Sequence, residues 1–432
     1  MIPILYAEDT RALAERLLRR SQLEDQQVTA SVKDIVAAVR EQGDTALLRC
    51  TRLYDKAEMT PEDLRVTSAE IEAAYAAADP AWVASMREAA RRITAFHEKQ
   101  KQRTWIDFDA DMALGQMVRP LASVGVYVPG GTAAYPSSVL MNVLPARVAG
   151  VGRIVMVTPP SPDGQVNNPL TLVAADIAGV QDIYKIGGAQ AVAALAFGTE
   201  TIPRVDKIVG PGNIYVANAK REVFGHVGID MIAGPSEVLV IADESANPAY
   251  VAADMLSQAE HDPLAATVVV AVGEALARRV QAEVARQAAL LPRREIVDAS
   301  LAAYGAIVVC RDVAEAAAVA DAVAPEHLEL AVADPFALLG SIHNAGAIFL
   351  GHYAPEPLGD YYAGPNHVLP TSGTARFFSP LNVEDFTKKS SLIYCTREAL
   401  AAAREDVTRL ARAEGLEAHA NAVDIRFADG PE

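Results

Sequence analysis

The sequence is poor in cysteine, in long apolar runs and in positive charge. Its 432 residues include only three cysteines, which lie far apart at Cys50, Cys310 and Cys395. Without a C-x-x-C pair or an even set of spacings, neither a disulfide framework nor a cysteine zinc site is indicated, and a reducing compartment fits best. No apolar run approaches the roughly 18 residues of a membrane span, so we expect no membrane partner.

The charge balance argues against a nucleic-acid partner. The chain has 38 basic and 55 acidic residues, a formal net charge of −17, and such a field repels a polyphosphate. The densest basic stretch, Arg87 to Arg103, is interrupted by Glu88 and Glu98, which is typical of a solvated helix face. The N-terminus lacks the basic segment and the apolar stretch of a signal peptide, so we expect a cytoplasmic protein.

Hydrophobic periodicity changes along the chain. The first hundred residues have a helical pattern, as between Ser31 and Arg40, where apolar residues recur at i, i+3, i+4 and i+7. From about residue 117, short apolar strands alternate with helices, which predicts largely parallel sheets with helices on both faces. The tail from about residue 382 differs, because it predicts a helix from Arg397 to Gly415 and a short closing strand around Val423 to Arg426.

Four glycine-containing turns follow predicted strands or lead into one. They are Val128–Gly131, Ile186–Gln190, Val209–Asn213 and Ala233–Glu237. Glycine allows close backbone approach to a ligand, and open α/β sheets bind ligands at the carboxyl ends of their strands. Each turn alone reads as an ordinary turn, but three carry an uncharged hydrogen-bonding residue, namely Gln190, Asn213 and Ser236. The standard G-x-G-x-x-G fingerprint is absent, so any bound NAD would be held in another way.

Two short motifs place metal-binding or titratable residues together. Gln258 and His261 share one face of a predicted helix, so an amide oxygen and an imidazole are both able to reach a metal. The alternative is a polar helix end before Asp262. Glu326 and His327 stand side by side at the start of a predicted strand and suit a reaction with two proton transfers. Their alternative reading is an exposed strand cap.

A third motif is the loop from Pro357 to Pro370, which contains Asp360 and His367. A long loop that carries such groups is usually functional if it is ordered, and the alternative is a mobile surface loop. Late in the tail, Glu414 and His419 read on their own as solvated helix-end residues.

Taken together, these motifs resemble the histidinol dehydrogenase family from roughly residue 30 to residue 426. The matching stretches are Tyr-Val-Pro-Gly-Gly from Tyr127, Gly-Gly-Ala-Gln from Gly187, Gly-Pro-Gly-Asn from Gly210, Ala-Gly-Pro-Ser-Glu-Val from Ala233, Leu-Ser-Gln-Ala-Glu-His from Leu256, Pro-Glu-His from Pro325, Gly-Asp-Tyr from Gly359 and Asn-His-Val-Leu-Pro from Asn366. Each piece alone is common, whereas their joint order is specific.

The resemblance implies roles for individual residues. The implied zinc ligands are Gln258, His261, Asp360 and His419. The implied acid–base pair is Glu326 and His327. The positions implied to bind the substrate are Ser236, Gln258, His261, His327, Asp360, His367, Glu414 and His419. The positions implied to hold NAD are Tyr127, Gln190 and Asn213.

The resemblance also implies the activity. It implies an NAD-dependent dehydrogenase that carries out a zinc-dependent four-electron oxidation of L-histidinol to L-histidine via bound L-histidinaldehyde. Two NAD⁺ and one zinc ion per active site would serve this reaction, which forms the last steps of histidine biosynthesis. The family is a homodimer whose C-terminal arm completes the partner's site, so Glu414 and His419 would act across the interface. Because Gln258 is neutral, the zinc would keep net positive charge and accept the substrate's nitrogens.

The expected fold is α/β, with two Rossmann-like parallel-sheet domains that lack the standard G-x-G-x-x-G, and with N- and C-terminal dimerisation arms. The expected division is an N-terminal helical arm at 1–26, a larger catalytic domain at 27–126 and 237–381, an inserted NAD-binding domain at 127–236 and a C-terminal arm at 382–432.

Three other functions stay open on the sequence alone. One is a related dehydrogenase for another small alcohol, such as a sulfonated diol, against which Glu414 and His367 argue because they suit an imidazole-bearing substrate. A second is a zinc hydrolase with Glu326 as base, which would leave the glycine turns without a purpose. A third is a non-catalytic metal-binding or scaffold protein, which would leave the Glu326–His327 pair idle.

Overall fold

The computed structural model describes residues 2–20, 26–130 and 135–428 of the chain. The chain divides into two compact units, of which the first is built from Met1–Gln100 and Leu121–Phe386 and the second from Lys101–Pro120 and Thr387–Glu432. None of the helices in the described ranges is long and apolar enough to cross a membrane.

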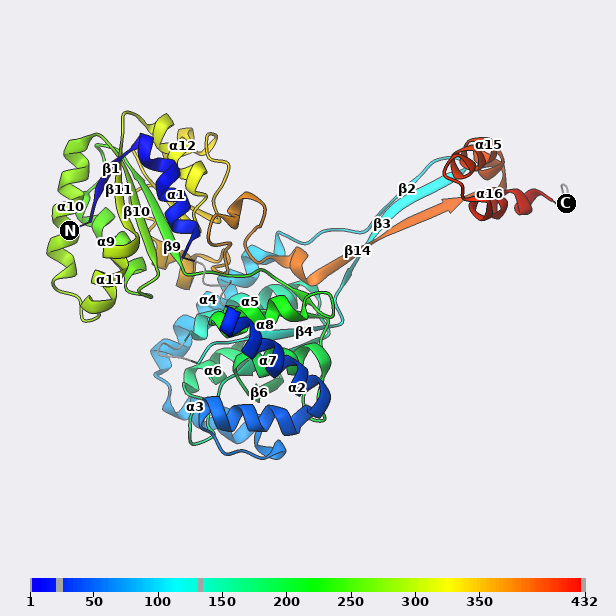
Figure 1. The fold of residues 1–432 in the computed structure, drawn as a ribbon, viewed down its shortest axis with the longest axis horizontal. Coiled ribbons are helices and arrows are strands. Elements are labelled where there is room, and N and C mark those ends of the chain that lie inside the picture. The colour runs from blue at the N-terminus through cyan, green and yellow to red at the C-terminus, as the bar shows by residue number, and fades with distance from the viewer. Residues whose placement is uncertain (1, 21–25, 131–134, 429–432) are drawn as a thin grey trace. The chain divides into compact units, whose positions relative to one another are not determined.

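The first unit contains a six-stranded parallel sheet in the order β1-β11-β10-β9-β12-β13 (Figure 1). Its strands are β1 Ile4–Tyr6, β9 Glu237–Ala242, β10 Ala266–Val272, β11 Gly305–Cys310, β12 His327–Ala331 and β13 Ala347–Leu350. Helices α9 Pro248–Ala259, α10 Glu274–Ala288 and α11 Arg294–Tyr304 bury one face, and α1 Thr10–Leu18, α12 Val313–Val323 and α13 Pro335–Leu339 bury the other. The strands read as apolar runs because both of their faces are covered.

The first unit also contains a five-stranded parallel sheet in the order β6-β5-β4-β7-β8. Its strands are β4 Ser123–Tyr127, β5 Arg153–Thr158, β6 Asp182–Lys185, β7 Lys207–Val209 and β8 Gly228–Ile229. Helices α2 Gln26–Cys50, α7 Gly188–Phe197 and α8 Ile214–Val223 share one core, and α3 Ser68–Ala77, α4 Pro80–Glu98, α5 Pro136–Ala149 and α6 Pro169–Ala178 share another. The two parallel sheets confirm the predicted α/β class.

The helices between residues 26 and 100 pack against the five-stranded sheet. The apolar face of α2, with Val32 and Val39, shares a core with Val192 and Leu195 of α7. The predicted domain boundaries stay a prediction. Residues 1–26 were predicted as a helical arm without a strand. In the structure, Ile4–Tyr6 form strand β1, which pairs with β11.

The second unit is an antiparallel sheet followed by two helices. Strands β2 Trp105–Phe108, β3 Met112–Pro120 and β14 Thr387–Cys395 lie side by side in the order β14-β3-β2 (Figure 1). Helix α15 Arg397–Ala413 confirms the predicted helix. The predicted closing strand at 423–426 is wrong, because α16 Glu417–Asp424 and a 3₁₀ turn at Ile425–Phe427 occupy it. Ion pairs from Arg404 and Arg412 to Asp424 stabilise this helical end.

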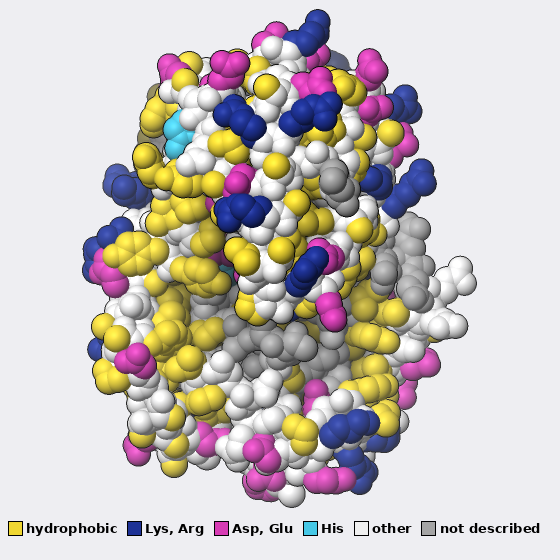
Figure 2. Space-filling model, turned by 90° about the vertical axis from the view of Figure 1, so that its left-hand side faces the viewer, with side chains coloured by type: hydrophobic (Ala, Val, Ile, Leu, Met, Phe, Trp, Pro, Cys, Tyr) yellow, Lys and Arg dark blue, Asp and Glu magenta, His cyan; other side chains and the backbone are white. Residues whose placement is uncertain are grey.

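Charged side chains of both signs share the surface of the molecule. On the face drawn in Figure 2, Lys and Arg are interspersed with Asp and Glu. Many are ion pairs within one helix, as between Arg278 and Glu274 and between Arg286 and Glu283 of α10. Such exposed pairs contribute little to stability, because solvent screens them.

Candidate active site

A cavity of about 560 Å³ lies in the first unit and is lined by loops of both parallel sheets. The five-stranded sheet contributes its carboxyl ends, through Pro129 after β4 and Gly212 after β7. The six-stranded sheet contributes its amino ends, through Ser236 before β9, His261 before β10 and His327 at the start of β12. Only the first arrangement follows the expectation that ligands bind at the carboxyl ends of strands.

Glu326 and His327 are 5% and 4% exposed, which excludes the exposed strand-cap reading. The backbone of Glu237 holds both side chains, because its N–H donates to Glu326 Oε2 at 2.8 Å and its carbonyl accepts from His327 Nδ1 at 3.0 Å. His327 Nδ1 lies 3.7 Å from Glu326 Oε2. His327 Nε2 is buried without a hydrogen-bond partner in the described part of the chain and lies 3.9 Å from Asp360 Oδ1.

The pKa values of this pair move in opposite directions. Burial, reinforced by the charges of Glu237 and Asp360, raises the pKa of the Glu326 carboxyl well above its usual value. Burial lowers the pKa of the His327 imidazole, although the Asp360 carboxylate acts to raise it. A neutral imidazole beside a carboxyl that holds its proton more tightly gives two proton-transfer groups with separate pKa values.

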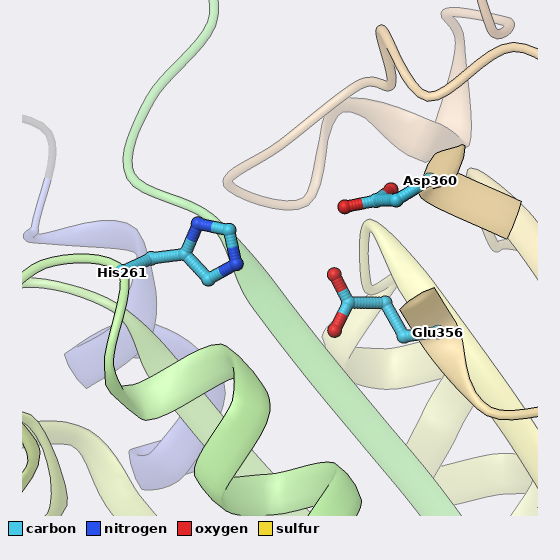
Figure 3. Close-up of side chains that lie close together, drawn as sticks. All are labelled: His261, Glu356 and Asp360. Atoms are coloured by element: carbon cyan, nitrogen blue, oxygen red, sulfur yellow. The ribbon is translucent and has the colours of Figure 1, made fainter. Parts of the chain in front are cut away.

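Next to this pair, three side chains are arranged as a metal could use them. His261, Glu356 and Asp360 each offer a ligand atom, and these atoms all lie within 4.8 Å of one another. Figure 3 shows the His261 imidazole facing the two carboxylates across an open space. Imidazole nitrogen and carboxylate oxygen are ordinary ligands of zinc.

Gln258 supplies an independent observation at the same place. It lies on the last turn of α9, is fully buried, and lines the cavity with His261. Its amide oxygen and nitrogen are both buried without a hydrogen-bond partner among residues 2–20, 26–130 and 135–428. An unsatisfied buried amide costs about 1–3 kcal/mol. A ligated cation would satisfy its oxygen, so the residues present fit a metal ion.

Glu356 was missed in the sequence analysis. It begins the short helix α14 Glu356–Leu358, which continues into a π-helical turn, η4 Gly359–Ala363. The segment was predicted as an irregular loop, so the i, i+4 spacing of Glu356 and Asp360 carried no weight. Glu356 is 2% exposed and accepts from Ser257 Oγ at 3.1 Å. Burial, with the neighbouring Asp360 charge, raises its pKa to about 8.

The structure also brings Ser236 and His367 to the cavity wall. His367 Nδ1 lies 3.1 Å from the backbone oxygen of Asp360, and its Nε2 lies 3.4 Å from Ser138 Oγ. These contacts fix the imidazole beside the Asp360 carboxylate. Ser236 precedes β9, and its backbone oxygen accepts from Ala266 N at 3.0 Å.

Of the three residues expected to bind NAD, one lines the cavity and two do not. Asn213 lines the cavity and caps α8, where its Oδ1 accepts from two backbone N–H groups. Tyr127 and Gln190 are buried side chains outside the cavity lining. The Tyr127 hydroxyl accepts from Gly188 N at 3.0 Å, and Gln190 Nε2 donates to Asp55 at 3.3 Å. Their contact with NAD stays a prediction.

Glu414 and His419 belong to the second unit. Glu414 caps the end of α15, and His419 lies on α16. Both side chains are exposed. Their expected roles at zinc and substrate stay predictions.

The fold and the cavity define a class of protein, an α/β protein in which a buried Glu–His pair adjoins three side chains spaced as metal ligands are. The sequence profile of the histidinol dehydrogenase family matches residues 18–427. The chain therefore belongs to the histidinol dehydrogenase family. This membership confirms the resemblance found in the sequence and makes the chain a dehydrogenase.

Individual relatives agree with this membership. The chain is 57% identical over 412 residues to a histidinol dehydrogenase of Caldanaerobacter subterraneus, covering 95% of both chains. It is 56% identical over 427 residues to that of Geobacter sulfurreducens, covering 98% of this chain and 99% of the relative. The crystal structure of histidinol dehydrogenase from Elizabethkingia anophelis superposes with a TM-score of 0.93 at 36% identity, covering 99% and 98% of the two chains.

Proposed function

We propose that the chain oxidises L-histidinol to L-histidine through bound L-histidinaldehyde, with two NAD⁺ and one zinc ion per active site. The observation that carries the proposal is the buried Glu326–His327 pair, which opens on the same cavity as Gln258, His261 and Asp360. Family membership supports the substrate and the place in histidine biosynthesis. The cavity volume of about 560 Å³ falls within the range of small-molecule and cofactor sites.

Gln258, His261 and Asp360 would hold the zinc, with His419 from the partner subunit as the fourth ligand. Bound there, the metal would orient the substrate through its imidazole and amino nitrogens. The unsatisfied amide of Gln258 supports this ligand set. Ser236 and His367 line the cavity, and they would bind the substrate together with Glu414 of the partner subunit.

His327 would act as the base in the first oxidation. Its Nδ1 hydrogen points to the Glu237 carbonyl, which leaves Nε2 unprotonated and directed at the cavity. Nε2 would take the hydroxyl proton of L-histidinol as hydride leaves the adjacent carbon. A base whose pKa lies near or below neutrality is free to accept that proton.

Glu326 would act in the second oxidation. It would take a proton from the water that adds to the bound aldehyde, and a second hydride transfer from the hydrate would give the carboxylate. NAD⁺ would accept the hydride in each step. The raised pKa of Glu326 suits a carboxyl that both accepts and returns a proton.

NAD⁺ would lie on the wall formed by the five-stranded sheet. Asn213, which begins α8 and lines the cavity, supports this placement. Contact of NAD⁺ with the buried Tyr127 and Gln190 stays a prediction. We further propose that the active form is a cytoplasmic homodimer in which the C-terminal segment of one subunit completes the site of the other.

The proposal is tested by following NADH absorbance with purified protein and L-histidinol. We expect NADH to form, to stop after treatment with a chelator, and to resume on addition of zinc. Failure of folded, zinc-loaded protein to form NADH from L-histidinol would contradict the proposed function. Full activity of a chelated, zinc-free preparation would contradict the zinc assignment alone.

A further inference from the structure

We propose that the buried Arg20–Glu237 ion pair is a positioning device for the Glu326–His327 acid–base pair. This inference rests on the proposed function, because Arg20 reaches that pair only through Glu237, whose backbone contacts both of its members. It concerns the end of the first helix, α1, and the first residue of β9. Glu237 lies in the Ala-Gly-Pro-Ser-Glu-Val stretch from Ala233, but neither residue was given a role from the sequence.

Glu237 is the contact point, because its backbone touches both acid–base residues. Its N–H donates to Glu326 Oε2 at 2.8 Å, and its carbonyl accepts from His327 Nδ1 at 3.0 Å. The carbonyl oxygen selects the imidazole form that carries hydrogen on Nδ1. Nε2 then keeps its lone pair toward the cavity. A shift of this one backbone unit would therefore move both groups and change which nitrogen carries the proton.

The side chain of Glu237 is what fixes that backbone unit. Its Oε2 accepts from Arg20 Nη2 at 2.6 Å, and its Oε1 accepts from Ser372 N at 2.6 Å. The side chains of Arg20 and Glu237 are 0% and 4% exposed. Charge-assisted hydrogen bonds of this length are stronger and more directional than neutral ones.

Arg20 connects three separate segments at this point. Its guanidinium also donates to the backbone oxygens of Ser236 at 3.3 Å, Leu264 at 2.9 Å and Leu17 at 3.0 Å. Arg20 therefore ties the end of α1 to the residues that precede β9 and β10. These are the strand ends that carry Ser236 and His261 to the cavity.

Stability alone does not account for such a pair. Burying two charges is costly, and an apolar pair of similar volume often gives equal or greater stability. The Arg20–Glu237 pair sits where the positions of Glu326 and His327 are set. Displacement of a catalytic group by about 1 Å is able to cost about 100-fold in rate, so positioning gives this pair a role that packing does not.

A second ion pair provides a matched control. Lys185 and Glu70 lie 2.7 Å apart with side chains 6% and 18% exposed. Neither residue lines the cavity or touches Glu326 or His327. The double variant Lys185→Met/Glu70→Gln removes a mostly buried pair without an effect on the acid–base groups.

The test compares this control with Arg20→Met/Glu237→Gln in the full-length, zinc-loaded protein. The double change leaves no unpaired buried charge. We expect kcat for L-histidinol to fall about tenfold or more with KM within about threefold, whereas the control keeps both constants. Arg20→Lys, which keeps the charge beside Glu237, is expected to retain kcat within about threefold and also covers the case in which the double variant does not fold.

The imidazole of His327 provides a second readout. In ¹⁵N-detected histidine NMR spectra, the wild type and Arg20→Lys should show hydrogen on Nδ1, and Arg20→Met/Glu237→Gln should lose that signature. Equal kcat in that double variant and in the control, or an Arg20→Lys variant as slow as the double variant, would overturn the inference. A wild type without histidinol oxidation would instead overturn the proposed function on which the inference rests.

Discussion

The two parallel sheets present opposite ends to one cavity. The five-stranded sheet presents the carboxyl ends of β4 and β7, and the six-stranded sheet presents the amino ends of β9, β10 and β12. The carboxyl-end wall consists of backbone turns and neutral side chains such as Asn213. The amino-end wall carries Gln258, His261, Glu326 and His327.

The difference indicates that the two walls of the cavity serve different purposes. Turns that follow parallel strands offer backbone groups at close range, which suits a cofactor common to many enzymes. The amino ends of β9 and β12 are adjacent, since His327 pairs with Val238. The Glu237 backbone therefore reaches both Glu326 and His327. We expect substitutions on the two walls to change different kinetic constants.

The largest effect is expected from His327→Asn on the amino-end wall. Loss of the base should lower kcat about 10²–10⁴-fold, with a small change in KM for L-histidinol. Steady-state kinetics measure both constants. His343→Asn is the control, because His343 is exposed and paired with Asp321 at 2.7 Å. A His327→Asn enzyme within tenfold of the wild-type kcat would contradict the assignment.

The next effect concerns zinc. In chelated protein, Gln258→Met should raise the free energy of unfolding by about 1 kcal/mol, because it removes an unsatisfied buried amide. The same change should reduce the stabilisation gained on adding zinc. Thermal unfolding measured with and without zinc tests both the gain in stability of the zinc-free protein and the smaller stabilisation by zinc. Gln287→Met is the control, because the Gln287 amide already donates to Ala249 O at 2.9 Å. Unchanged zinc stabilisation in Gln258→Met would argue against ligation.

A smaller effect is expected on the carboxyl-end wall. Asn213 and Asn168 both cap helices that cover the five-stranded sheet, α8 and α6. Replacing either by Ala should cost about 1 kcal/mol of stability. Only Asn213→Ala should also raise KM for NAD⁺, by about threefold to tenfold, because only Asn213 lines the cavity. Equal KM values in the two variants would remove Asn213 from the cofactor site.

The smallest effect on activity is expected from Glu70→Gln. Burial acts to raise the pKa of Glu70, but hydrogen bonds from Lys185 and Thr67 outweigh it, so the folded-state pKa lies below 4.5. The carboxylate therefore stabilises the fold above the unfolded pKa, and this contribution is lost as pH falls through the folded pKa. Urea unfolding should show a loss of about 1 kcal/mol or less at pH 7, because solvent screens this partly exposed pair, and the loss should shrink toward pH 3. A kcat outside twofold of wild type would contradict a purely structural role.

The sequence predicts the α/β class because the strands are buried on both faces and read as apolar runs between helices. It also predicts the grouping of Gln258 with His261 and of Glu326 with His327, because these residues are near neighbours in the chain. The placement of α2 to α4 against the five-stranded sheet depends on tertiary packing, and local periodicity carries no information about it.

Long-range contacts explain the remaining differences. Arg20 and Glu237 are 217 positions apart, and no local pattern joins them. Glu356 stands between Pro355 and Pro357, so proline signals favoured a loop where the chain forms a helical turn. The pairing of β3 with β14 joins residues 112–120 to residues 387–395. Such a distant pairing leaves no local signal, so the tail from about residue 382 was predicted without a partner strand.

The most direct test of the account is the number of NADH molecules formed per L-histidinol consumed when L-histidinol is limiting. Two successive oxidations by one acid–base pair in one cavity require two NADH and one L-histidine for each L-histidinol, with no free aldehyde in solution. A ratio of one NADH to one L-histidinol, with L-histidinaldehyde released, would contradict it.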